Sequence, residues 1–234
     1  MTDSRTGEIM IIFKQKEKEL YSAAFDILKG ADTIGGAFFY GNMASVFGDW
    51  DINVCGKHIS LQRVSKAKAR FMAASLTSDE PLGQMEIFID GVAKGIVFQG
   101  FHKKSLFKDY SVHHIIYDRQ QIYHMYPIGF GEEGSKNPVY VEEYGVEKQV
   151  ALTEKPSVVY DDMHEFFCYM DDSLIPTVII FCALMYSMGC YTPGTKMTKG
   201  IKRTNSITKE KELLSKYDPE KARGFKAGFE KEDV

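Results

Sequence analysis

The chain has 234 residues, 44% of them hydrophobic and 13% aromatic, which is enough apolar surface for one core of ordinary size but too little for two large domains. Its formal net charge of −3 lacks the clear basic excess of nucleic-acid-binding proteins, so we expect no nucleic-acid partner. Residues 195–234 hold eleven Lys and Arg against seven Asp and Glu, a net +4, which leaves −7 on residues 1–194.

The cysteines give information about the redox environment. Cys55, Cys168, Cys182 and Cys190 form no CxxC pair and no dense disulfide framework. Cys182 and Cys190 are eight residues apart, about 12 Å along a helix, which is too far for a disulfide. The first residues also lack the cationic-then-apolar order of a secretory signal. We therefore expect a reduced protein in the cytoplasm.

The N-terminal segment, residues 1–33, contains a helix-like pattern. Leu20, Ala24 and Ile27 share one face of a helix over residues 14–29, while most of the charged residues lie elsewhere. A glycine follows this stretch, as expected at a helix C-terminus. The pattern predicts an N-terminal amphipathic helix.

From Ile34 onward the apolar period changes to two, and turn residues recur at short intervals. Asp90-Gly91 is the clearest hairpin dipeptide among them. The pattern predicts an antiparallel arrangement of about twelve short strands, over residues 37–40, 44–47, 51–55, 58–64, 67–76, 85–89, 92–98, 110–117, 121–127, 139–144, 146–152 and 158–170.

Residues 174–191 contain no charge, and Asp172 and Ser173 before them are good N-cap residues. A helix that is apolar on every face must be surrounded by protein or by lipid. The run is short for a membrane span and includes a proline and a glycine, whereas a dozen strands need an apolar element to cover their inner faces. We therefore favour a helix buried in the protein over a single-pass anchor.

This order of elements resembles the tubby C-terminal-like superfamily, which includes the LURP-one-related proteins and the phospholipid scramblases. The resemblance rests on residues 34–191, especially on 110–118, 121–125, 139–141 and the helix 174–191. It implies a mainly β (α+β) fold, with a closed twelve-stranded antiparallel barrel over residues 34–194 enclosing the hydrophobic helix. It also implies binding to phosphoinositides or membrane surfaces, as in some members of the superfamily.

Two groups of basic residues are candidate anion or lipid contacts. Lys66, Lys68 and Arg70 would lie on one face of the strand predicted over residues 67–76, and such a row could meet lipid phosphates. The alternative is a solvated outer sheet face, which antiparallel sheets commonly have. Lys103 and Lys104 form a second and looser cluster with neighbouring aromatic residues.

The basic polar tail, residues 195–234, carries Phe225 and Phe229 one helical turn apart among Lys and Arg. Such a segment could lie on an anionic membrane or dock onto a protein partner, and a weakly ordered tail is the alternative.

Enzymatic motifs are weak by comparison. Residues 129–134 match GxGxxG, but a strand follows them instead of the helix that binds a pyrophosphate. His113 and His114 are neighbours on a predicted strand and must point to opposite faces, so they cannot grip one metal ion together. We expect no metal, no cofactor and no catalytic residues.

The sequence therefore favours a non-enzymatic, cytoplasmic binding module that recognises anionic lipid at a membrane surface. A membrane-tethered protein anchored by residues 174–191 and an enzyme without a recognisable motif are the alternatives.

Overall fold

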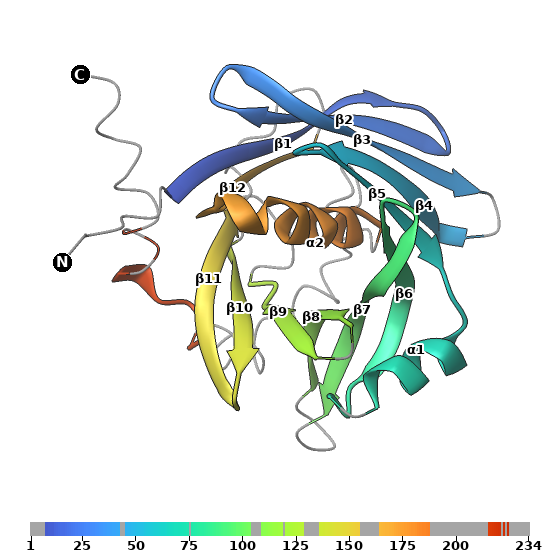
Figure 1. The fold of residues 1–234 in the computed structure, drawn as a ribbon, viewed down its shortest axis with the longest axis vertical. Coiled ribbons are helices and arrows are strands. Elements are labelled where there is room, and N and C mark those ends of the chain that lie inside the picture. The colour runs from blue at the N-terminus through green and yellow to red at the C-terminus, as the bar shows by residue number, and fades with distance from the viewer. Residues whose placement is uncertain are drawn as a thin grey trace, which may run out of the picture.

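The computed structural model describes residues 8–42, 45–74, 76–103, 109–118, 120–128, 136–154, 164–187, 215–220, 222 and 224. Within these residues, twelve antiparallel strands form a closed barrel around one helix (Figure 1). The strands are β1 Glu8–Lys18, β2 Ser22–Lys29, β3 Asp32–Asn42, β4 Ser45–Val54, β5 Lys57–Arg63, β6 Glu80–Ile89, β7 Val92–Lys103, β8 Asp109–Tyr117, β9 Gln121–Met125, β10 Lys136–Glu143, β11 Val146–Glu154 and β12 Glu165–Asp171. The predicted mainly β barrel is confirmed.

Each strand pairs with the next along the chain, and β1 pairs with β12 to close the barrel. Ile11 on β1 lies opposite Cys168 on β12 in this closing pair. The turn between β6 and β7 is the predicted Asp90-Gly91, and both residues have positive φ, 50° and 79°. Such backbone angles match the twist of the flanking strands and favour Gly and Asp, so this hairpin prediction is also confirmed.

The predicted N-terminal helix over residues 14–29 is wrong, because these residues form the end of β1, a tight turn and all of β2. On β2 the side chains of Ala23, Phe25 and Ile27 are buried with period two, as a strand with one face on the core requires. Leu20, which the helical pattern needed on its apolar face, is 83% exposed in the turn. The first described strand of the barrel therefore begins at Glu8, and residues 8–33 belong to barrel strands and turns, not to a separate helical segment.

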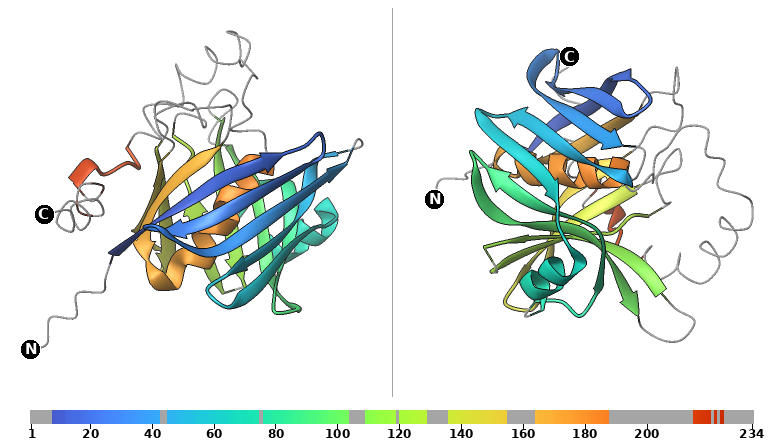
Figure 2. Two further views of the ribbon diagram at one scale, coloured as in Figure 1. Left: turned by 90° about the horizontal axis from the view of Figure 1, so that it is seen from above. Right: turned by 90° about the vertical axis from the view of Figure 1, so that its right-hand side faces the viewer.

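Helix α2, Ile175–Ser187, runs through the interior of the barrel (Figure 2). A short 3-10 turn, η1 Asp172–Leu174, leads into it from β12. Within the described part of the chain, no helix is long and apolar enough to cross a membrane. The helix predicted over residues 174–191 is thus found inside the protein, with residues 188–191 outside the described part of the chain.

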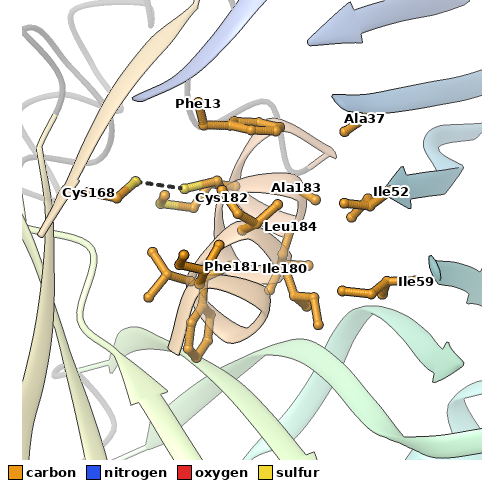
Figure 3. Close-up of a cluster of buried hydrophobic side chains, with 14 of the residues drawn as sticks. Phe13, Ala37, Ile52, Ile59, Cys168, Ile180, Phe181, Cys182, Ala183 and Leu184 are labelled. Carbon is orange, nitrogen blue, oxygen red and sulfur yellow. Dashed lines mark hydrogen bonds between the residues drawn. The ribbon is translucent and has the colours of Figure 1, made fainter. Parts of the chain in front are cut away.

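Wall side chains surround α2 on its apolar faces. Figure 3 shows Ile180, Phe181 and Leu184 of the helix among residues such as Phe13 and Ile52 of the barrel wall, all fully buried. Sulfur atoms also meet here, because the Cys168 and Cys182 Sγ atoms lie 3.7 Å apart as free thiols. The uncharged sequence of the helix is what permits this packing on all sides.

Helix α1, Lys66–Ala73, corrects a second prediction, that of a strand over residues 67–76. Ser65 caps it, since its hydroxyl accepts a hydrogen bond from the backbone N–H of Lys68. Its Ala69 and Ala73 pack on the outside of the wall over residues that include Phe98. The residues between β5 and β6 therefore form a helix on the outer surface of the barrel (Figure 2).

Candidate functional site

A chain of hydrogen-bonded titratable groups crosses the outer face of the barrel wall. His114 Nε2 lies 2.8 Å from Asp79 Oδ2, and His114 Nδ1 lies 2.9 Å from His124 Nδ1. His124 Nε2 continues the chain to Glu142 Oε2 at 3.2 Å. Asp79 is 8% exposed, His114 2% and His124 7%, so the two rings and the first carboxylate are shielded from solvent. We call these four residues the histidine relay.

Strand register brings the relay together. His114 and His124 are directly opposite one another on β8 and β9, and His124 in turn is opposite Tyr140 on β10. The inner faces of these strands hold core residues such as Ile115, so His114 points outward by alternation. Asp79 reaches His114 from the residue just before β6, at the end of the connection from α1.

The hydrogen-bonding capacity of the relay limits its chemistry. Two imidazoles that contact each other through Nδ1 and face a carboxylate through Nε2 can hold and transfer a proton. Among the described residues, no three His, Cys, Asp or Glu side chains gather into a metal-binding group. The relay therefore has the geometry of a proton-binding element.

The described part of the basic tail docks beside the relay. Lys216 Nζ forms an ion pair with Glu147 on β11, and the Tyr140 hydroxyl donates a hydrogen bond to the Lys216 carbonyl. Tyr217 packs against an outer cluster of buried side chains that includes Tyr126. Residues 215–220, which we call the docked segment, thus bind to the outer wall over β9, β10 and β11, while Phe225 and Phe229 lie outside the described residues.

The groups around Glu147 favour its ionised form, as its ion pair with Lys216 requires. Burial raises the pKa of the Glu147 carboxyl, but hydrogen bonds from Lys216 and Tyr126 and the charges of Lys216 and His124 bring it below its ordinary value. Glu147 is also the cross-strand partner of Glu142. The relay and the docked segment therefore share one acidic pair, Glu142 and Glu147.

The predicted cation row is present on α1 in a different form. Lys66 Nζ lies 2.5 Å from Glu80, Arg70 pairs with the same carboxylate, and Lys68 Nζ lies 2.6 Å from Glu86. The hydrogen bond from Arg70, followed by that from Lys66, lowers the pKa of Glu80. The three predicted residues do lie together, but in a network with two carboxylates that the sequence pattern did not indicate.

The other predicted basic residues are less informative. Lys103 is the last residue of β7, and Lys104 follows outside the described residues. The GxGxxG stretch, residues 129–134, also lies outside the described part of the chain.

The relay is what sequence reasoning missed. The strand pattern could have placed His114 and His124 on the same face only if the β8–β9 register had been known, and no sequence signal points to Asp79. Comparison of the chain with protein-family models, curated proteins and solved structures found no match. The resemblance to the tubby-like superfamily stays a prediction.

Proposed function

We propose that the protein is a non-enzymatic binding module that attaches to anionic lipid surfaces through helix α1. The observation that carries this proposal is Phe71, which is 69% exposed on α1 directly after Arg70. An exposed aromatic ring among cations is the combination that interfacial helices use, because the ring enters the headgroup boundary while the cations meet phosphates. The tubby-like resemblance points to the same class of ligand.

The ion pairs on α1 are compatible with exchange for lipid phosphate. The side chains of Lys66, Lys68 and Arg70 are 48%, 48% and 57% exposed, and that of Glu80 is 46% exposed. The pairs of Lys66 and Arg70 with Glu80 are exposed, and exposed ion pairs contribute only about 0–1 kcal/mol, so a phosphate can replace that carboxylate at small cost. Glu86, the partner of Lys68, is only 11% exposed. Three cations face two carboxylates here, which leaves a local net charge of +1 on an acidic body.

Vesicle sedimentation tests the proposal. The full chain is mixed with neutral phosphatidylcholine vesicles and with vesicles that also contain phosphatidylserine, at low and high salt. We expect binding only to the anionic vesicles, weakened by salt. The triple variant K66Q/K68Q/R70Q should bind more weakly by about fivefold per cation, since each basic residue near such a surface contributes about 1 kcal/mol.

Glu80→Gln gives the sharpest prediction, because it should strengthen vesicle binding by freeing Lys66 and Arg70. The matched control is K14Q/K16Q on β1, where the two lysines are similarly exposed, 53% and 51%, and similarly ion-paired, to Glu165 and Asp26. Equal binding by the α1 variant and this control, or equal sedimentation with neutral and anionic vesicles, would overturn the proposal.

A further inference from the structure

The hydrogen bonds of the relay fix the number of protons that it holds. An ionised carboxylate only accepts hydrogen bonds, so His114 Nε2 must donate to Asp79, and His124 Nε2 must donate to Glu142. The two Nδ1 atoms, 2.9 Å apart, then need one proton between them. Without a proton on either Nδ1, two lone pairs face each other. With a proton on both, two N–H groups face each other.

The fully bonded relay therefore holds one proton more than two neutral imidazoles. This proton gives the His114–His124 pair a charge of +1 between the carboxylates of Asp79 and Glu142. Opposite charges on both sides favour that charged form, whereas burial of the rings opposes it. The Glu142 side chain is 39% exposed, so solvent can reach one end of the relay.

Other charged groups surround the pair. On β11, Glu147 lies opposite Glu142, and the docked segment brings Lys216 and Asp218 to the same side of the wall. On the α1 side, Lys68 and Glu86 form their own ion pair. His113 lies on the other face of β8, where burial, followed by the charge of His114, lowers its pKa and disfavours its protonation.

We propose that the His114–His124 pair is a proton-binding switch, in which the shared proton competes with Lys216 for the acidic pair Glu142 and Glu147. When the proton is bound, a positive charge already lies against these carboxylates, and Lys216 gains less by approaching them. When the proton leaves, both Nε2–H groups still donate to their carboxylates, but the positive charge beside Glu142 is lost, and the acidic pair has Lys216 as its cation. The docked segment therefore binds the wall more tightly as the pH rises.

Linkage makes the effect reciprocal. If the proton weakens docking of residues 215–220, then docking must lower the affinity of the pair for its proton by the same factor. Coupling between sites of this kind is typically fivefold or more, and we expect about fivefold here because Glu142 is partly solvated. The proposal is independent of lipid binding through α1.

Nuclear magnetic resonance of the full chain, with histidine and tyrosine isotopically labelled, tests both halves. The ring signals of His114 and His124 should titrate together as one group that binds a single proton, in buffer with a chelator. The ring signals of Tyr217 should report a docked fraction that increases with pH over the same range. Independent titration of the two rings, or a Tyr217 signal that does not change with pH, would overturn the switch.

Two variants separate the switch from a structural role. Lys216→Gln leaves the relay untouched, and it should make the pair bind its shared proton about fivefold more tightly. His124→Gln should remove the pH dependence of the Tyr217 signal, whereas the control His58→Gln, at an exposed histidine paired with Asp51, should leave it unchanged. An unchanged pair titration in Lys216→Gln, or Zn²⁺ binding in place of the proton when the chelator is omitted, would contradict the proposal.

Discussion

His113 and His114 are consecutive residues on β8, yet they meet opposite environments. His113 points into the barrel and is fully buried, and neither of its ring nitrogens has a hydrogen-bond partner among the described residues. Burial, with a smaller contribution from the charge of His114, lowers the pKa of His113 to about 3. His114 is almost equally buried on the outer side, but both of its nitrogens are hydrogen-bonded.

The difference shows that burial alone does not decide the state of an ionisable group. The inner side of the wall faces the apolar α2, so an ionised ring there has no partner to offset its lost hydration. The outer side is covered by α1 and the docked segment, and it supplies carboxylates at both ends of the His114–His124 pair. The inner face of β8 thus provides apolar packing, whereas its outer face provides hydrogen-bond partners for a buried polar side chain.

The strongest test of the inner face is Phe181→Ala in α2. Phe181 is fully buried within the core that joins the helix to the wall. Removing such a ring loses its transfer free energy and leaves a cavity, so we expect the free energy of unfolding to fall by about 3–5 kcal/mol. Chemical denaturation followed by tryptophan fluorescence measures this, since Trp50 is buried in the same core.

Phe71→Ala is the control for that measurement. Phe71 is 69% exposed on the outer surface, and its loss should change stability by less than about 0.5 kcal/mol. Similar losses in the two variants would mean that the barrel interior is not the main source of stability.

The next largest effect concerns pH and His113. Its pKa is about 3 in the folded protein against an ordinary 6.5, so the unfolded chain takes up a proton first as the pH falls. The stability contribution is therefore complete above pH 6.5 and is lost progressively toward pH 3. At pH 4.5 the loss should be roughly 3 kcal/mol relative to pH 7.5.

His113→Leu should remove this component of the acid-side loss, and it also eliminates two buried nitrogens that have no hydrogen-bond partner within the described part of the chain. Denaturant melts of the parent chain and the variant between pH 4.5 and 7.5 provide the comparison. His58→Gln, which changes an exposed histidine, should keep the full pH dependence of the parent. If His113→Leu lost as much stability on acidification as the parent, the contrast between the two faces of β8 would be wrong.

The general architecture could be predicted from the sequence because its signals are local. The uncharged run before Ser187 leaves a buried helix as the best solution, and period-two alternation predicts strands. The predicted number of strands agrees with the structure, but the members differ. Predicted strands 44–47 and 51–55 both overlap the single strand β4, the predicted strand 67–76 overlaps α1, and β1 and β2 complete the twelve.

The two errors have physical causes. Over residues 14–29, Leu20 and Ala24 satisfy a helical period by chance, while the core is filled by the alternating set that includes Phe25. At α1, the alternation of basic and apolar residues from Lys66 to Phe71 imitates a strand, and Ser65 was the available sign of a helix N-terminus. Both segments contain short apolar patterns that fit the helical period of about 3.6 residues as well as the strand period of two.

The candidate site depends on contacts that no local pattern encodes. Alternation correctly placed His113 and His114 on opposite faces, but the partners of His114 are distant in sequence. Asp79 precedes it by 35 residues, and Glu142 follows His124 by 18. Their meeting depends on the register of β8, β9 and β10 and on how the connection from α1 to β6 packs, and sequence periodicity specifies neither.

The outer wall can be tested by Gly100→Ala, for which we expect the smallest of these effects. A Cβ at Gly100 on β7 would lie 2.6 Å from His114 Nε2 and 2.8 Å from Asp79 Cβ, so the bond between these two side chains must shift. Overpacking of this kind should cost about 1–3 kcal/mol in denaturant unfolding, and the His114 ring signal should move with it. Gly224→Ala, where a Cβ meets nothing within 4 Å, is the control. A Gly100→Ala variant with parental stability and an unchanged His114 titration would show that Asp79 does not hold the ring, because the added methyl group can be accommodated only by displacing that contact.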